Sequence, residues 1–522
     1  MNAGHANPAV GSQGSPSGGA AATSAKGGSS HNLGMIALIA MAVGTMVGGG
    51  VFALSGMVVQ EAGAGSIIAY ILAGIVMMLS ALCFAAVSSR AKPGETGYAP
   101  LGRTLGPVWR FITMWAFYIM GVSATAYVLM SFGSYFRVFV PHAAAVVVSL
   151  VAVAALMFLN WGPTALVGKA ETVMVGFKVG VLILVIIFGF IAFKPSFFDN
   201  WAPHGFGSVL SATALLFTAH AGFNVITNVS CSVKNSEKKV PRAIILSLAI
   251  VAAIYIGVAI ALVVSGQAGD HGFAQNGLTL AAKKIMGAWG VTLVGIAALV
   301  STLSGANANL LGSGDLLVRM AATGDIPSKF GRLSKKGNPI LAITVSTAII
   351  VVLMLAAHFT GSGGMRLIVV FTNVSGIIAL ILVDITAAKM AFGHWKTPGV
   401  KLKGGMLIPI LAIIAAAIQI PSLGKWWETA IGTAMVAVGF LIWAFRKHSD
   451  PQEVHEINHH LAHNNTPLHR VARGVDYVLS GGKRHANVPS VPPVPPMPVA
   501  AGAAGSGGVA SEASGSADAK RS

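Results

Sequence analysis

The sequence predicts an all-α membrane protein that crosses the bilayer many times. The 522 residues are 54% hydrophobic and only 10% charged, whereas about a quarter of the residues of a soluble globular protein are charged. The mean hydropathy is +0.75. Long apolar segments recur along the chain, and glycine clusters interrupt two of them. These observations favour a polytopic membrane protein over every soluble class.

The apolar segments are close to the roughly 20 residues that a helix needs to cross the hydrocarbon core. We predict twelve membrane-spanning helices within a membrane domain at 32–446, and they cover 33–58, 66–89, 107–138, 142–160, 170–193, 207–231, 240–265, 286–318, 338–358, 364–390, 405–421 and 426–446. The two cysteines, Cys83 and Cys231, fall inside these segments and indicate no disulfide framework.

Both tails are predicted to be disordered. Residues 1–31 are rich in Gly, Ser and Ala and lack the apolar stretch of a signal peptide. Residues 447–522 are first His-rich, then Pro-rich, then Gly-rich, and mostly disordered. His455 to His459 match the zinc-protease pattern H-E-x-x-H. Without a third ligand and a shaped cavity we expect neither an enzyme nor a metal centre there, the alternative being weak chelation by His455, His459, His460 and His463.

The distribution of positive charge predicts the orientation in the membrane. Eighteen lysines and arginines fall in loops on the side of the N-terminus, and six fall in the loops of the other side. By the positive-inside rule, both termini are expected in the cytoplasm. The net charge of +18 is spread over short loops without a basic globular domain, which excludes nucleic acid as a partner.

The two glycine clusters predict where a substrate binds. The first surrounds Gly48, Gly49 and Gly50, and the second follows Thr218. Unwound backbone in a membrane survives only where protein or a water-filled cavity covers it, and paired breaks in two halves of a chain are typical of secondary transporters. The alternative for the first cluster is a packing face, because Gly44 and Gly48 form a small-residue motif. The predicted substrate-binding residues are Met46, Gly48, Gly49, Gly50, Thr218, His220, Ala221, Gly222 and Asn224.

Several polar residues inside apolar segments are candidates for coupling. Lys178 lies well inside a predicted span, where a charged lysine costs roughly 2.5–3.5 kcal/mol, so it carries a proton or extends towards the interface. Ser301 and Ser304 either line a cavity or bond one helix to another. His220 either touches substrate or bonds an unwound carbonyl. Asp384 either serves proton transfer or interacts with the nearby Lys389, and the structural role is favoured.

Five motifs in order resemble the amino acid–polyamine–organocation superfamily, and within it the proton-coupled amino-acid transporters. They are the Gly-rich run ending at Phe52, Pro93 to Tyr98, Lys169 leading to Lys178, Gly222 to Asn228 with the loop that follows, and Ala298 to Asn307. The resemblance covers about 33–446. It implies a five-plus-five inverted repeat with broken helices 1 and 6 and two appended helices.

The resemblance also implies roles for particular residues. Lys178 is expected to carry the coupling proton, with Ser301 and Ser304 supporting it and Phe223 acting as a gate. Asn224, Cys231 and Ser232 stand where relatives often have acidic residues, which favours a neutral substrate over a cationic one. Asp315 replaces a residue that is often basic in relatives.

We therefore expect an amino-acid transporter of the inner membrane, with substrate, protons and lipid as its partners and no cofactor. The open alternatives are amino-acid exchange without net proton flux, another small substrate such as a potassium ion or a nucleobase, and a transporter-derived sensor.

Overall fold

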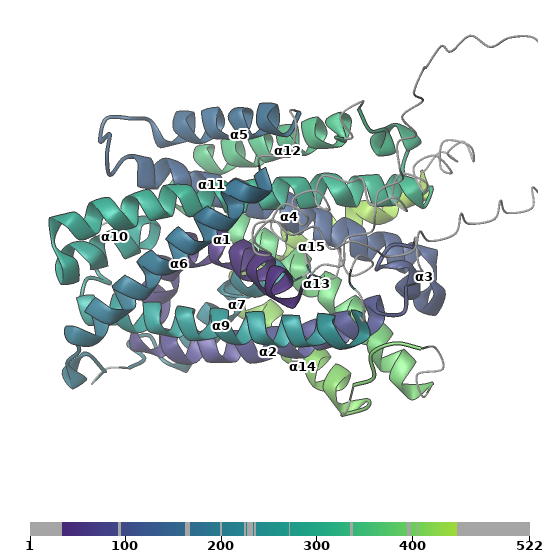
Figure 1. Cartoon of the computed structure of the whole chain (residues 1–522), viewed down its shortest axis with the longest axis horizontal. Coiled ribbons are helices and arrows are strands. Elements are labelled where there is room, and N and C mark those ends of the chain that lie inside the picture. Colours follow the sequence, from purple (N-terminus) through teal and green to yellow (C-terminus); the bar gives the residue numbers. More distant parts are fainter. Residues whose placement is uncertain are drawn as a thin grey trace, which may run out of the picture. The chain divides into compact units, whose positions relative to one another are not determined.

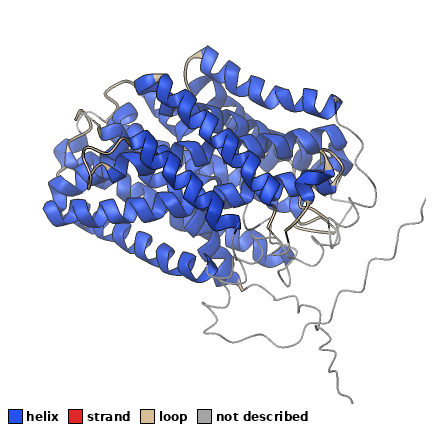
Figure 2. Cartoon of the chain, turned by 90° about the horizontal axis from the view of Figure 1, so that it is seen from above, coloured by secondary structure: helices blue, strands red, loops and turns tan. Residues whose placement is uncertain are grey.

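The computed structural model describes residues 34–445 except 92–94, 162–166, 199–200, 224–225, 227–232, 234–235, 271, 335–337, 394–397 and 403. The two tails predicted to be disordered, together with Asn224, Cys231 and Ser232, therefore lie outside the described residues. The described part is built from helices without a strand (Figure 2), which confirms the all-α prediction.

The first half of the chain forms α1 (Met35–Ala62), η1 (Gly63–Gly65), α2 (Ser66–Ser88), α3 (Ala99–Leu105), α4 (Pro107–Phe136), α5 (Ala145–Trp161), α6 (Val167–Ile191), η3 (Pro195–Phe198), α7 (Phe206–Leu215) and η4 (Thr218–Phe223). The second half forms α9 (Ser236–Ser265), α10 (Phe273–Met286), α11 (Ala288–Ala322), η6 (Ser328–Gly331), α12 (Ile340–Phe359), η7 (Gly361–Gly363), α13 (Gly364–Phe392), α14 (Leu407–Ser422) and α15 (Trp426–Ala444).

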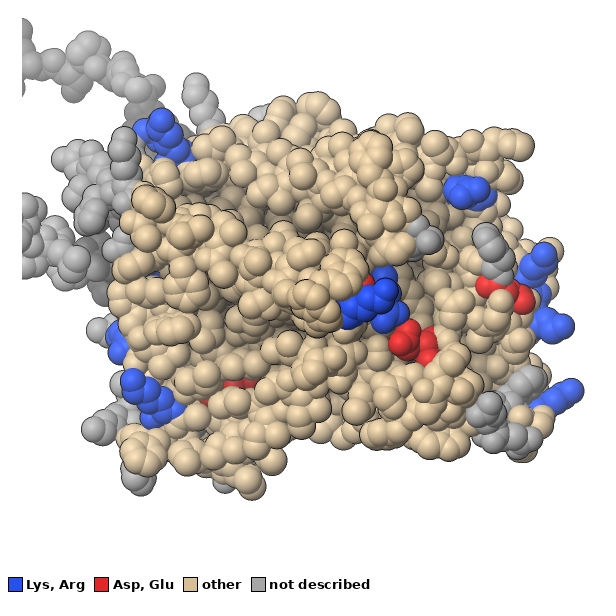
Figure 3. Space-filling model, turned by 180° about the vertical axis from the view of Figure 1, so that it is seen from behind, with Lys and Arg blue, Asp and Glu red and all other residues tan. Residues whose placement is uncertain are grey.

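Each of the twelve predicted segments contains a helix. Within the described ranges, nine stretches are long and apolar enough to cross a membrane; one of them, Met35–Ser88, holds both α1 and α2. α5 and α14 are apolar but shorter. On the face shown in Figure 3, most charged side chains lie towards the two ends; a small cluster of both signs lies nearer the middle, and the remaining surface between the ends is largely uncharged. The protein is thus a multi-pass membrane protein, while twelve crossings and the inverted repeat stay predictions.

Helix α1 occupies the centre of the helical arrangement (Figure 1). It packs against α4, α6, α9, α10 and α11 and against η4, and most of its residues are buried. Around it, α5 and α12 lie side by side at one edge, and α2 packs along α9. A helix that contacts this many neighbours has no lipid-facing stripe, which explains why its sequence is apolar all round.

The predicted break in the first segment is wrong, because α1 is continuous from Met35 to Ala62. The glycines serve close packing instead. A Cβ on Gly48 would lie 2.8 Å from the Cα of Gly305 in α11, and a Cβ on Gly50 would lie 2.7 Å from the Cα of Ala219. Glycine has low helix propensity, but a continuous helix keeps its backbone hydrogen bonds and still lets neighbouring backbones approach. These close approaches fit the packing-face alternative, while a role of Gly49 and Gly50 in substrate binding stays a prediction.

The second predicted break is present. α7 ends at Leu215, and the chain continues through Leu216 and Phe217 into the 3-10 helix η4. The amide N–H groups of Phe217 and Ala219 donate to carbonyls three residues back, at 3.3 and 3.0 Å. The backbone thus changes from α-helical to the tighter 3-10 winding at this point.

The close contact between α1 and α11 gives a first prediction. Gly305→Ala should lower the thermal unfolding midpoint in detergent, because its Cβ would lie 2.7 Å from the amide nitrogen of Gly49. Overpacking of this kind costs about 1–3 kcal/mol. The matched control is Gly180→Ala in α6, where a Cβ meets nothing within 4 Å. Helix propensity alone favours alanine at both sites, so equal shifts of the two midpoints would contradict the packing argument.

Candidate functional site

A buried cavity lies between α1, α4, η4 and α11. Its lining consists of Thr45, Met46, Gly49, Gly50, Phe117, Met120, Gly121, Ala124, Tyr127, Val128, Thr218, Ala221, Gly222, Ala308, Asn309, Gly312, Ser313 and Leu316. Six of the nine predicted substrate-binding residues are among them. The cavity thus joins the centre of α1 to the break after α7, although only one of those segments is broken.

The cavity wall carries no charged side chain among the described residues. Three of its hydroxyls are already bonded, since Thr45 donates to the Met41 carbonyl, Ser313 to the Asn309 carbonyl and Thr218 to Asn373. The Tyr127 hydroxyl and the Asn309 carboxamide make no hydrogen bond with other described residues. These two neutral groups are therefore available to a ligand, and neither was among the predicted substrate-binding residues.

A tyrosine of α9 holds the two sides of the cavity together. The Tyr255 hydroxyl lies 2.6 Å from the carbonyl oxygen of Met46 in α1 and 3.1 Å from that of Ala219 in η4. Its ring packs edge-on against Tyr70 and His220. No local pattern in the sequence marks Tyr255, because its partners are backbone groups of distant segments.

His220 lies behind the break and does not line the cavity. Its Nδ1 is 3.1 Å from the carbonyl oxygen of Leu216, and the imidazole is fully buried. A Cβ on Gly74 of α2 would lie 3.9 Å from Nε2. This position fits the alternative in which His220 bonds a carbonyl of the break rather than the substrate. Gly48 is also absent from the cavity wall, since it faces Gly305.

Lys178 is completely buried where α6 meets α1 and α11. Its ammonium nitrogen donates to the carbonyl of Gly44 at 2.7 Å and lies 3.4 Å from the Ser304 hydroxyl. Ser301 bonds α1 as well, with its hydroxyl 2.7 Å from the Val47 carbonyl and 2.6 Å from that of Gly48. Both serines thus join helix to helix and do not line the cavity. Lys178, Ser301 and Ser304 lie close together beside one stretch of α1, and their role in coupling stays a prediction.

Phe223 closes a cluster of four aromatic rings. Phe84 lies 5.7 Å from Tyr98, 5.8 Å from Phe117 and 6.0 Å from Phe223, measured between ring centroids. Phe117 also lines the cavity. The cluster therefore borders the cavity, and a gating role for Phe223 stays a prediction.

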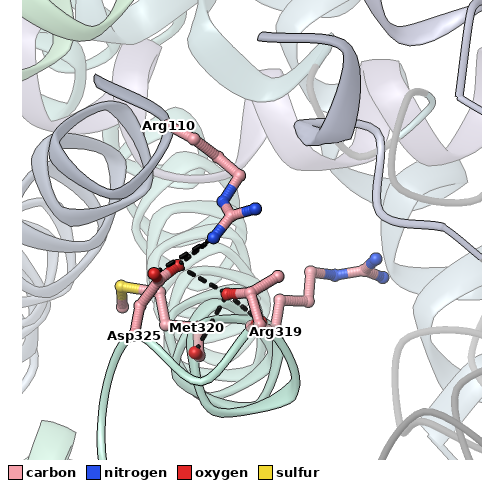
Figure 4. Close-up of polar contacts among 5 residues, drawn as sticks. Arg110, Arg319, Met320 and Asp325 are labelled. Atoms are coloured by element: carbon pink, nitrogen blue, oxygen red, sulfur yellow. Dashed lines mark hydrogen bonds and ion pairs between the residues drawn. The ribbon is translucent and has the colours of Figure 1, made fainter. Parts of the chain in front are cut away.

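Ion pairs fasten the ends of α4 and α11 at one end of the protein. Arg110 makes two bonds to the Asp325 carboxylate, at 2.8 and 3.0 Å, and Asp325 also accepts from Thr323 (Figure 4). Asp315 pairs with Arg319 one turn later, at 2.6 Å. Asp315, which stands where the resembling family often has a basic residue, thus has a cationic partner on its own helix.

Asp384 bonds α2 rather than Lys389. The Ser80 hydroxyl donates to its Oδ2 at 2.8 Å, while the Lys389 ammonium donates to the carbonyl of Thr104. Asp384 thus links α13 to α2, and the predicted interaction with Lys389 is wrong because the lysine side chain extends to the Thr104 carbonyl at the end of α3.

The helices and their apolar surfaces define a multi-pass membrane protein with an internal cavity whose described lining carries no charge. The sequence profile of the amino acid permease family matches residues 37–443, so the chain belongs to that family. Over 448 residues it is 27% identical to the methylthioribose transporter of Bacillus subtilis, covering 79% of this chain and 93% of that protein. Over 455 residues it is 24% identical to the branched-chain amino acid permease BcaP of the same organism, covering 82% and 96%.

A third relative is the inner membrane transport protein YbaT of Escherichia coli. It is 28% identical over 342 residues, which cover 63% of this chain and 78% of that protein. Membership in a permease family with transporter relatives makes the protein a transporter of amino acids or related substrates and not an enzyme.

The Tyr255 contacts give a second prediction. Tyr255→Phe should weaken ligand binding on the order of tenfold, because it leaves the Met46 and Ala219 carbonyls without this donor beside the cavity. Affinity can be measured by thermal-shift titration with the best ligand from a screen of twenty amino acids. Tyr135→Phe is the matched control, since Tyr135 donates to the Phe52 carbonyl of α1 outside the cavity. Equal loss of affinity in both variants would show that Tyr255 has no special role at the site.

Proposed function

We propose that the protein takes up neutral amino acids together with protons by alternating access. The observation that carries the proposal is an uncharged cavity directly beside a junction where a fully buried lysine bonds α1. The positive-inside count supports cytoplasmic termini and a location in the cell membrane.

The cavity chemistry supports a ligand without a charged side chain. A cationic side chain would leave water for a wall that offers no carboxylate among the described residues, and this desolvation is costly. Because α1 is continuous, the substrate carboxylate would bond the neutral donors of Tyr127 and Asn309 rather than a half-helix end of α1. The end of η4 would supply carbonyl acceptors for the ammonium group.

The glycines of the cavity support an apolar substrate side chain of some size. On Gly49, Gly50, Gly121 and Gly222, an added Cβ would lie under 3.0 Å from neighbouring protein atoms, so packing accounts for these four. On Gly312 a Cβ would meet nothing within 4 Å. Gly312 therefore borders open space, with Ala308 and Leu316 one turn before and after it and Phe117 and Met120 also in the wall. The relative named as a branched-chain amino acid permease is consistent with this class of substrate.

Lys178 supports proton coupling. A charged ammonium in a buried membrane position is expensive, so the neutral amine is accessible in the transport cycle. When protonated, the group holds α6 to the Gly44 carbonyl of α1 close to Ser304 of α11. Loss of the proton weakens this link, because a neutral amine is a poorer hydrogen-bond donor than an ammonium group.

Lys178→Ala tests the proposed coupling. In proteoliposomes, the variant should bind and exchange labelled leucine but lose accumulation driven by an imposed pH gradient. The control is Lys169→Ala near the start of α6, which should retain accumulation. Undiminished accumulation by Lys178→Ala would place the coupling site elsewhere. Exchange without proton-driven accumulation in the wild type would favour the exchanger, and binding without any transport would favour the sensor.

Gly312→Val tests the proposed specificity. The added side chain should weaken the binding of leucine and phenylalanine at least about tenfold, because it occupies the open space beside Gly312. The affinity for alanine should stay nearly unchanged. Gly176→Val is the control, since Gly176 also has open space at its Cβ but does not line the cavity.

In wild-type competition assays, arginine and lysine should displace labelled leucine poorly. Better displacement by arginine would refute the neutral-substrate assignment.

A further inference from the structure

A carboxamide of α13 fills a gap in the backbone ladder of the broken segment. The Asn373 side chain is fully buried. Its Oδ1 accepts from the amide N–H of Thr218 at 2.9 Å, and its Nδ2 donates to the carbonyl of Leu215 at 3.2 Å. The Thr218 hydroxyl donates to the same Oδ1. One side chain from a distant helix thus bonds backbone groups on both sides of the break.

The bonds next to the gap show what the carboxamide replaces. Phe217 N–H donates to the Ala214 carbonyl, and Ala219 N–H donates to the Leu216 carbonyl, both three residues back. The same pattern would join Thr218 N–H directly to the Leu215 carbonyl. Instead, each of these two groups bonds Asn373. The side chain is therefore inserted in place of a single backbone hydrogen bond, one of the recognised causes of a sharp helix kink.

The chemistry of asparagine matches this gap. The carboxamide presents an acceptor and a donor on one planar group, as the separated N–H and C=O require. An ionised carboxylate has no donor for the Leu215 carbonyl, and an alanine reaches neither group. In a membrane interior, either loss would leave buried backbone groups unpaired.

The position of α13 is fixed against both sides of the cavity. Three residues after Asn373, a Cβ on Gly376 would lie 2.6 Å from the Met120 sulfur and 2.9 Å from the Phe217 ring. Met120 lines the cavity from α4, and Phe217 lies in the break. This contact holds the backbone of α13 close to the gap that Asn373 fills.

We propose that Asn373 is a positioning residue of the substrate site. By replacing one backbone hydrogen bond, it sets the geometry of the break and so places Thr218, Ala221 and Gly222 in the cavity wall. The assignment rests on the proposed function in taking this cavity as the amino-acid site. It adds that α13, which contributes no residue to the cavity lining, determines the shape of that site.

Asn373→Asp provides the decisive test, because its side chain fits the gap in only one protonation state. A protonated carboxyl can donate to Leu215 and accept from Thr218, whereas a carboxylate would face the Leu215 carbonyl. Exchange of labelled leucine in proteoliposomes, with equal pH on both sides, gives KM for variant and wild type from pH 5 to pH 8. The ratio of the two KM values should rise roughly tenfold or more with pH, while the ratio of maximal rates changes less. A ratio that stays constant with pH would overturn the proposal.

Two further variants separate positioning from general stability. Asn373→Ala should raise KM at every pH, whereas Ser375→Ala should not. Ser375 is a suitable control because its buried hydroxyl, two residues away on α13, makes no hydrogen bond within the described part of the chain. If the two alanine variants changed KM equally, Asn373 would act only through packing and not by positioning the break.

Hydrogen exchange provides a readout that needs no substrate. The peptide 206–223 should exchange faster in Asn373→Ala than in wild type or Ser375→Ala, because the Thr218 amide loses its acceptor. Faster exchange in a protein that fails to bind or move any neutral amino acid would support the inserted carboxamide while refuting the proposed function. Unchanged exchange would refute the role of Asn373 whatever the substrate.

Discussion

The requirement that every buried backbone group find a hydrogen-bond partner governs this structure. Two segments that looked alike in sequence meet the requirement in different ways. α1 keeps a continuous helix through three successive glycines, and its neighbours approach because those glycines have no side chains. The segment after α7 lacks one backbone hydrogen bond, and the Asn373 side chain of α13 bonds the two backbone groups concerned. The cavity lies where these two segments meet.

The contrast explains which features the sequence can reveal. Apolar length and the low charge content located the helices, because both are properties of a continuous stretch of chain. The buried lysine and the two serines were also predictable, since a polar residue in an apolar segment needs a nearby partner. Lys178 and Ser301 bond the carbonyls of Gly44, Val47 and Gly48 on α1, and Ser304 lies beside the Lys178 ammonium group.

Other features could not be read from the chain. Three consecutive glycines are equally compatible with unwinding and with close packing, and only the opposing Gly305 decides between the two. The groups that stabilise the second break come from α9 and α13, about 35 and 155 residues further along the sequence. Tyr255 and Asn373 carry no local signature, because their partners are backbone atoms whose identity does not depend on the side chain. His220 is recognisable in the sequence as a histidine inside an apolar segment. Its partner, however, is the backbone carbonyl of Leu216, and its side chain does not line the cavity.

Four hydrogen bonds to α1 share a property that matters for mutagenesis of this helix. Donors from four helices reach it: Lys178 from α6, Tyr255 from α9, Ser301 from α11 and Tyr135 from α4. Every acceptor on α1 in these bonds is a main-chain carbonyl. These four bonds therefore do not depend on the side chains of α1, and replacing its residues one by one would leave each of these acceptors in place.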